Sequence, residues 1–372
     1  RFLCLVALGS ILKLASTISV QTSPIFSLGE QGYKAFRIPG IAVLDDNRPF
    51  VAFAEGRKYG CGDFAGQHDI VSKRSMDAGL TWSEFQVVAD PTVTFNCSNP
   101  TTLDKCQFWD PTPVWDAKTG ELHLLAGYAD SREQRLNGTG SVWAWVSSDD
   151  GASWVGPRDI SASIGTDTRP TPANGHGIQI NAGPHAGRLV VPAYSHGVGT
   201  LTPGSYALLS DDHGKTWRRS SSVAPNSAEG DIVEAFSPPG RLLFNLRSEN
   251  KSMPCATGVS HCRVEATSDD GGETWGDVRV VGDLADPMCK AGVSRWSAKE
   301  ALVFANDNSD HSRSNVTLKL SFDGGQTWPS SELVSSAGGY VDVQVSENTG
   351  VVIFENNTCA ISVGLVALKD VQ

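Results

Sequence analysis

Histidine and cysteine side chains, the common ligands of catalytic metals, do not form a metal-binding motif in this sequence. His176, His185 and His196 lack the paired i, i+4 spacing of a helical metal site, and no acidic third ligand stands in register with them. No two cysteines have the CxxC spacing of a zinc site. The sequence therefore predicts neither a metal nor another cofactor.

Arginine, tyrosine and carboxylate side chains remain as candidates for chemistry. The planar guanidinium of an arginine can bind a carboxylate through two parallel hydrogen bonds. A tyrosine titrates near pH ~10, so it needs a neighbouring base and a positive surrounding before it can act as a nucleophile. Which of these side chains meet depends on the elements that position them.

One eight-residue motif, S-x-D-x-G-x-T/S-W, occurs five times and defines those elements. The copies are about 50 to 70 residues apart, a period typical of propeller blades or another stacked array. They are SMDAGLTW at 75–82, SSDDGASW at 147–154, SDDHGKTW at 210–217, SDDGGETW at 268–275 and SFDGGQTW at 321–328.

The chemistry of this motif is structural. Asp-x-Gly is a turn signal, because the aspartate accepts hydrogen bonds from nearby backbone N–H groups and glycine adopts an unusual φ. Each copy follows an alternating apolar run, so we expect it to cap a β-hairpin with its tryptophan packed between neighbouring units. We assign these aspartates to folding and not to catalysis.

The motif resembles the Asp box of sialidases, and a second motif makes the resemblance specific. Phe36-Arg37-Ile38-Pro39 matches the FRIP motif that opens the sialidase catalytic domain. The order FRIP, several Asp boxes and a late Gly-Tyr is similar to a sialidase from about residue 24 to 365. The resemblance implies an all-β, six-bladed β-propeller, with the sixth blade closed by pairing of the N- and C-terminal strands. It also implies an exo-α-sialidase that removes terminal sialic acid from sialylated glycans.

The resemblance assigns a set of side chains to the sialic acid carboxylate. Sialidases use three arginines from separate blades, and the matching residues are Arg37, Arg247 in FNLRSEN and Arg313 in SRSNVTL. Glu355, in VVIFENN, resembles the late glutamate that orients the FRIP arginine. Without the resemblance, each arginine would be read as solvated at a blade edge, and Glu355 as an ordinary residue at a strand end.

The resemblance also assigns the catalytic groups. Tyr340 in AGGYVDVQV matches the tyrosine nucleophile, and Glu234 in GDIVEAF matches the glutamate that serves it as base. A neutral phenol avoids the repulsion between a carboxylate nucleophile and the substrate carboxylate. Asp63, in KYGCGDFAGQHDIV, is the better match for the general acid/base, and Asp69 is the alternative because it could simply begin a strand. The alternatives for Tyr340 and Glu234 are a packed core tyrosine and a rim carboxylate.

Five further side chains match positions that contact the substrate in the family. Glu55 and Arg57 in AEGR are expected at the ring hydroxyls, Trp109 and Asp110 in FWDPTPVWD at the N-acyl group, and Tyr194 in VVPAYSH at the aglycone. For Trp109 and Tyr194, core packing is nearly as good an explanation.

The remaining features concern domain organisation and compartment. The chain of 372 residues carries a net charge of −11 and no basic tract, which disfavours nucleic-acid binding. We expect a signal peptide at 1–20, interrupted by Lys13 and so not a membrane span, followed by one catalytic domain at 21–372. The alternative for the N-terminal segment is a first β-strand of the fold. Of the seven cysteines after the leader, Cys97/Cys106 and Cys255/Cys262 are close enough to pair. Together with five N-x-S/T triplets, these features predict a protein of the secretory pathway, secreted or lysosomal.

Two other functions are compatible with the motifs. A trans-sialidase would pass sialic acid to another sugar from the same site. A non-catalytic Asp-box propeller would bind a ligand without turnover, but such a protein needs no tyrosine/glutamate pair.

Overall fold

The computed structural model describes residues 19–45, 48–97, 99–102, 105–136, 140–165, 171–195, 204–250, 255 and 258–368. The predicted leader, apart from its last two residues, and His196 lie outside the described residues. In this part of the chain no helix is long and apolar enough to cross a membrane.

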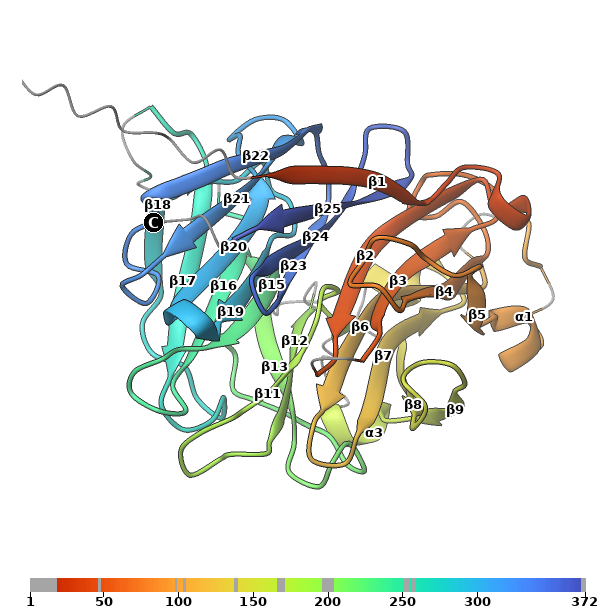
Figure 1. Ribbon diagram of the computed structural model, residues 1–372. Helices are drawn as coiled ribbons and strands as arrows, with labels where there is room; N and C mark the ends of the chain where they lie inside the picture. The colour runs from red at the N-terminus through yellow and green to blue at the C-terminus, as the bar shows by residue number, and fades with distance from the viewer. Residues whose placement is uncertain are drawn as a thin grey trace, which may run out of the picture.

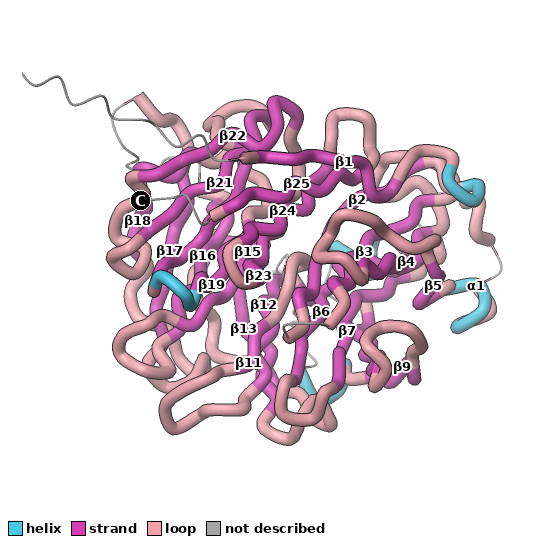
Figure 2. Tube along the Cα trace, viewed as in Figure 1, coloured by secondary structure: helices cyan, strands magenta, loops and turns pink. Residues whose placement is uncertain are grey.

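The described residues form an all-β propeller of sheets around a ring (Figures 1 and 2). Four sheets are separate blades. The first contains β1 (Val20–Phe26), β25 (Ile361–Ala367), β24 (Thr349–Glu355) and β23 (Val341–Ser346). The second contains β10 (Thr171–Pro172), β11 (Ile178–Gln179), β12 (Leu189–Ser195), β13 (Gly204–Ser210) and β14 (Arg218–Arg219).

The other two separate blades each contain four strands. One is formed by β15 (Ser227–Glu234), β16 (Leu242–Ser248), β17 (Cys262–Ser268) and β18 (Arg279–Ala285). The other is formed by β19 (Gly292–Trp296), β20 (Ala301–Asp307), β21 (Ser314–Ser321) and β22 (Ser330–Ala337). The helices are short: α1 (Pro91–Thr94), α2 (Arg132–Leu136), α3 (Ser161–Ile164) and two 3₁₀ turns at Glu30–Gly32 and Ser297–Lys299.

The expectation of six separate blades is not met by the strand pairing. The remaining strands form a single eight-stranded sheet, because one parallel bridge between His68 and Gln107 joins β4 to β6. Its strands are β2 (Ala35–Val43), β3 (Phe50–Arg57), β4 (His68–Ser75), β5 (Gln86–Ala89), β6 (Gln107–Asp116), β7 (Glu121–Ala129), β8 (Ser141–Ser147) and β9 (Val155–Asp159).

The N- and C-terminal strands close the ring, as the sequence predicted. β1 pairs antiparallel with β25, from Val20 opposite Val366 to Phe26 opposite Ile361. The inner strands β2, β6, β12, β15, β19 and β23 contact one another in this order, and β23 contacts β2 again. Residues at the start of these inner strands therefore meet near the axis, although the chain separates them widely.

The core lies between neighbouring sheets. One buried cluster joins β20 to β24 through Val303 and Val352, and another joins β13 to β16 through Leu209 and Phe244. Both clusters consist mainly of aliphatic side chains with a few aromatic ones, so neighbouring blades pack through buried apolar surfaces.

The five Asp-box turns have one geometry. In the third copy, Asp212 accepts hydrogen bonds from the Thr216 N–H at 2.8 Å and its hydroxyl at 2.6 Å, and Ser210 accepts from the Gly214 N–H at 2.8 Å. The same bonds recur at Asp77, Asp149, Asp270 and Asp323. These aspartates are committed to backbone turns, as the sequence predicted.

Three disulfides link the described cysteines. Cys97–Cys106 and Cys255–Cys262 are the two pairs expected from their proximity. The third, Cys61–Cys359, joins residues 298 positions apart and connects the loop after β3 to the turn between β24 and β25. Cys289 is a buried free thiol.

Candidate active site

Arg37 stands at the start of β2, where a β-bulge redirects the strand. The register of β2 against β3 shifts between Arg37 and Gly40, and Ile38 in the bulge has a φ of 59°. A positive φ is rare for a β-branched residue and costs about 1–3 kcal/mol, so the surroundings must hold it. Glu355 does so: it accepts from the Ile38 N–H at 2.9 Å and from Arg37 Nε at 3.0 Å.

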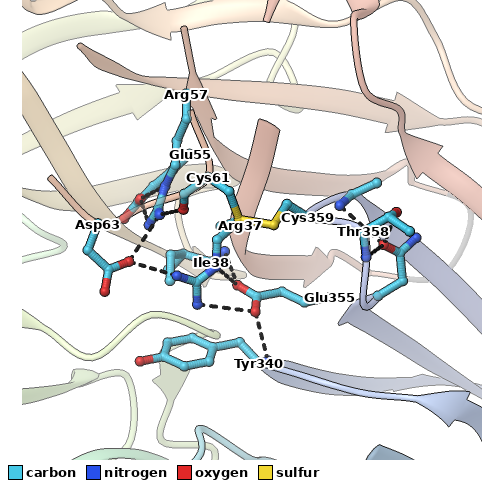
Figure 3. Close-up of a disulfide and its surroundings, with 12 residues drawn as sticks. Arg37, Ile38, Glu55, Arg57, Cys61, Asp63, Tyr340, Glu355, Thr358 and Cys359 are labelled. Atoms are coloured by element: carbon cyan, nitrogen blue, oxygen red, sulfur yellow. Dashed lines mark hydrogen bonds and ion pairs between the residues drawn. A yellow bond between two sulfur atoms is a disulfide. The ribbon is translucent and has the colours of Figure 1, made fainter. Parts of the chain in front are cut away.

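Two glycines allow the backbone before Tyr340 to approach neighbouring blades. A Cβ atom on Gly338 would lie 2.2 Å from an Asp307 carboxylate oxygen, and one on Gly339 would lie 2.6 Å from Cβ of Glu355. Only glycine fits at such distances. The Gly339 N–H donates to Asp307 at 3.1 Å and the Tyr340 N–H to Glu355 at 3.3 Å. The carboxylate that orients the FRIP arginine therefore also holds the tyrosine (Figure 3).

The Tyr340 hydroxyl donates a hydrogen bond to Glu229, not to Glu234. Glu229 lies on β15 and is 5% exposed, and its second oxygen accepts from Arg247 Nη1 at 2.5 Å. Arg247 on β16 also forms an ion pair with Glu249 through Nε at 2.8 Å. The structure thus places a buried carboxylate between a phenol and a guanidinium.

The electrostatics of this group keep the proton on the tyrosine. Burial, and then the charge of Glu229, raise the pKa of Tyr340 well above its usual value, while Arg247 and Arg313 oppose this rise. Burial also raises the pKa of Glu229, but Arg247 and the hydrogen bond from Tyr340 outweigh it, so the pKa is lowered. The free protein therefore holds a neutral phenol against an ionised base.

The three predicted arginines surround Tyr340. Arg247 Nη1 lies 3.5 Å from the phenol oxygen, and the guanidinium carbons of Arg37 and Arg313 lie 5.5 and 5.1 Å from the ring centroid. Arg313 is exposed and donates to the Met288 carbonyl at 3.2 Å. Three blades thus contribute a guanidinium to one place, and two of these groups, Arg37 and Arg247, are paired with carboxylates.

Asp63 reaches this group from the loop after β3. Its side chain is 51% exposed, and Oδ1 lies 2.7 Å from Arg37 Nη1 and 3.0 Å from Arg57 Nη1 (Figure 3). Arg57 and Glu55 are fully buried and form an ion pair of 2.6 Å. Arg57 contacts Asp63 from its buried position, and the contact of Glu55 and Arg57 with the substrate ring stays a prediction.

Asp69, the alternative acid/base, is fully buried at the start of β4. It accepts hydrogen bonds from the Tyr33 hydroxyl and from Gln67 at 2.7 Å, and it forms an ion pair with Lys58 at 3.1 Å. These partners occupy its carboxylate, and the geometry therefore favours Asp63.

Glu234, the predicted base, lies away from Tyr340, and this position corrects the sequence prediction. It is the last residue of β15, where it accepts from the Asn181 and Ala182 N–H groups at 2.8 and 3.0 Å and forms an ion pair with Arg295 at 3.2 Å. Glu234 and Arg295 line a cleft of about 320 Å³ at the opposite end of the inner strands. Glu234 therefore holds the loop that contains Asn181 and Ala182, and Tyr340 is not among its partners.

Trp109, Asp110 and Tyr194 form a buried group on β6 and β12. Their exposed fractions are 1%, 1% and 3%, and the Tyr194 hydroxyl donates to Asp110 at 2.8 Å. Core packing, the alternative kept open for the two aromatic residues, therefore agrees with the structure better than direct substrate contact.

The fold gives His176 the acidic neighbours that sequence spacing did not show. Asp342 and Asp231 lie 2.9 and 3.4 Å from its Nδ1, and all three side chains are buried. The Lys290 ammonium lies 3.3 Å from Asp231 and 3.4 Å from Asp342. The carboxylates are thus neutralised by side chains of the protein itself.

Comparison with known proteins identifies the family. A family model described as BNR repeat-like domain matches residues 48–353. A sialidase of Micromonospora viridifaciens is 34% identical over an alignment of 326 residues, and the match covers 82% of this chain and 47% of that protein. The chain belongs to the sialidase family.

Solved structures agree with this sialidase assignment at the level of the fold. A sialidase described as Hadza microbial sialidase Hz136 has a TM-score of 0.81 at 23% identity and covers 94% of this chain and 68% of its own. A leech intramolecular trans-sialidase, solved with 2,7-anhydro-Neu5Ac, has a TM-score of 0.74 at 18% identity. The match covers 94% of this chain and 70% of the trans-sialidase chain. This sialidase-family chain spans about half the length of its Micromonospora relative.

One rule would have located Glu229 in this sialidase-family sequence. Arg37 is at the start of its inner strand, and Tyr340 immediately precedes another. Residues that meet at one end of the ring must lie at the same end of each inner strand. Glu229 is near the start of β15, whereas Glu234 is its last residue.

Proposed function

We propose that this protein is an exo-α-sialidase that hydrolyses terminal sialic acid from glycans with retention of configuration. One observation carries the proposal: the Tyr340 hydroxyl donates to the buried carboxylate of Glu229 while three arginines surround the ring. A binding protein has no need of a phenol paired with an ionised base.

The arginines would bind the carboxylate that sialic acid carries on its anomeric carbon. Arg37 uses Nε and Nη2 for Glu355, and its Nη1 contacts Asp63. A substrate carboxylate would replace Asp63 on Nη1 and would share the charge of Arg313, which is exposed. Binding would thereby release the Asp63 carboxyl for proton transfer.

In the first step, the Tyr340 oxygen attacks the anomeric carbon as the bond from that carbon to the leaving oxygen breaks. Glu229 accepts the phenol proton, and Asp63 donates a proton to the leaving oxygen. Arg247, which contacts both Glu229 and the phenol oxygen, stabilises the negative charge that develops during attack.

In the second step, water attacks the anomeric carbon on the face that the leaving group vacated. Asp63 accepts a proton from that water, the bond to Tyr340 breaks, and Glu229 returns its proton to the phenolate. Two inversions at one carbon give net retention.

Hydrolysis can be tested by following an α-sialoside by proton NMR. The proposal predicts free sialic acid that appears first as the α anomer. A β anomer as first product would contradict the covalent mechanism. Release of 2,7-anhydro-sialic acid would instead indicate intramolecular transfer, and no product from folded protein would indicate a binding module.

We also propose the finer features that the sequence suggested. The eight-stranded sheet is best understood as two blades, β2–β5 and β6–β9, because β2 and β6 occupy successive places among the inner strands. A leader at 1–20 and a single catalytic domain at 21–372 are part of this proposal. Passage through the secretory route is supported by three disulfides, which persist in oxidising compartments.

A further inference from the structure

The Cys61–Cys359 disulfide joins the segments that carry Asp63 and Glu355, two carboxylates of the site. Cys61 is two residues before Asp63, and Cys359 follows Glu355 on the turn between β24 and β25 (Figure 3). The disulfide therefore connects the loop that carries Asp63 to the blade that carries Glu355, although its two cysteines are 298 positions apart in the chain.

The backbone carbonyls of both cysteines accept hydrogen bonds from groups next to Asp63 or Arg37. The Cys61 carbonyl accepts from Arg57 Nη1 at 2.5 Å, and this same nitrogen lies 3.0 Å from Asp63. The Cys359 carbonyl accepts from the Phe36 N–H at 2.9 Å, immediately before Arg37. The bond thus fixes the distance between the strand that carries Arg37 and the loop that carries Asp63.

Non-covalent contacts also hold this loop, such as the hydrogen bond from the Gln67 N–H to the Pro100 carbonyl at 2.9 Å and the Arg132 guanidinium over the Phe64 ring. The loop runs from Lys58 to Gln67, and glycines flank Cys61 on both sides. Glycine has the largest backbone freedom to lose on ordering, so such a loop samples many conformations unless it is tethered. Besides the disulfide, Gln107 Nε2 donates to the Asp63 carbonyl at 3.1 Å. Gln107 Nε2 also donates to the Gly66 carbonyl at 3.1 Å, and the disulfide is the covalent link from this loop to the turn after Glu355.

We propose that the Cys61–Cys359 disulfide is a positioning element for Asp63, which holds the general acid/base at the leaving-group oxygen. This inference rests on the proposed role of Asp63 as acid. Opening the bond should affect the steps in which Asp63 transfers a proton and leave Tyr340 and Glu229 in place, since separate backbone bonds to Asp307 and Glu355 hold Tyr340.

The test compares leaving groups in a Cys61→Ala/Cys359→Ala variant. A sialoside of an alcohol, such as sialyllactose, needs a proton on its leaving oxygen, whereas a 4-nitrophenyl sialoside needs much less acid assistance. Because complete loss of general acid catalysis costs ~10²–10⁴-fold, a displaced acid should lower kcat/KM for sialyllactose roughly tenfold or more. The fall for the 4-nitrophenyl sialoside should stay within about threefold.

The matched control is Cys255→Ala/Cys262→Ala, which removes another disulfide, one that joins the first residue of β17 to the segment before it. Its ratio of the two kcat/KM values should equal that of the wild type. An equal loss on both substrates in the Cys61/Cys359 variant would overturn the inference and leave the bond with a stabilising role only.

If the Cys61/Cys359 variant fails to fold, the same ratio is measured on the folded wild type treated with a phosphine reductant, with alkylation to confirm that the bond is open. An unchanged ratio there also overturns the inference, whereas a wild type inactive on both sialosides would refute the proposed function instead.

Discussion

Replacing Glu229 with glutamine should show whether Glu229 is the base that takes the proton of Tyr340. The amide would keep the size of the side chain and one acceptor for the Tyr340 hydroxyl, but it could not take the phenol proton. General base catalysis contributes ~10²–10⁴-fold, so kcat should fall by roughly that factor, equivalent to about 3–5 kcal/mol of transition-state stabilisation. KM should change less, because the carboxylate-binding arginines remain.

The structure also indicates that the variant will fold. Removing a carboxylate from a buried ion pair is costly when it leaves a charge alone. Here Arg247 keeps its ion pair with Glu249 at 2.8 Å, and its side chain is 17% exposed. The loss of activity should therefore exceed what the loss of stability explains.

Initial rates on a fluorogenic aryl sialoside, with thermal melting of each protein, provide the assay. Glu234→Gln is the matched control, because it changes the glutamate at the other end of the same strand. Its bonds to Asn181 and Ala182 should weaken, which lowers the melting temperature, while kcat per folded molecule stays near that of the wild type. The reasoning is refuted if Glu229→Gln retains kcat within threefold of wild type, or if Glu234→Gln loses as much.

Three further predictions follow from other parts of the structure. Arg37→Lys keeps the charge but loses the two-bond contact with Glu355, so kcat/KM should fall by about an order of magnitude or more, as steady-state kinetics will show. Asp212→Ala removes two turn bonds and should lower the free energy of unfolding by about 1–2 kcal/mol in denaturant titrations, with kcat unchanged in the folded fraction. Burial raises the pKa of Asp307 to about 7, so the folded protein keeps a proton that the unfolded chain releases near pH ~4, and this contribution to stability is present at low pH and lost as pH rises through 7. The free energy of unfolding of wild type relative to Asp307→Asn should accordingly fall between pH 4 and 7, by at most about 4 kcal/mol.

The sequence predicted the features of this protein that depend on local chemistry. The Asp-box turns follow from Asp-x-Gly bonding within four residues, and the two short-range disulfides follow from cysteines close in the chain. Arg37 and Tyr340 were found because their immediate neighbours form recognisable motifs. Each of these signals is contained within a few consecutive residues.

The features that were missed depend on how distant segments meet. Glu229 and Glu234 lie on the same strand, and only the end at which the inner strands converge distinguishes them. Cys61 and Cys359 are 298 residues apart, a separation from which no pairing can be deduced. The burial of Glu55 and Arg57 behind Asp63 likewise depends on a loop path that three nearby glycines leave open in the sequence.

Covalent trapping of Tyr340 tests the central claim most directly. The protein is incubated with a 3-fluorosialosyl fluoride, in which the ring fluorine slows both steps and the fluoride leaving group allows the first to proceed. Mass spectrometry of the digest should show one added sugar on the peptide that contains Tyr340, and Tyr340→Phe should not be labelled there. A label on Glu229 or Asp63, or no label on a protein that hydrolyses sialosides, would contradict the proposal that Tyr340 is the nucleophile.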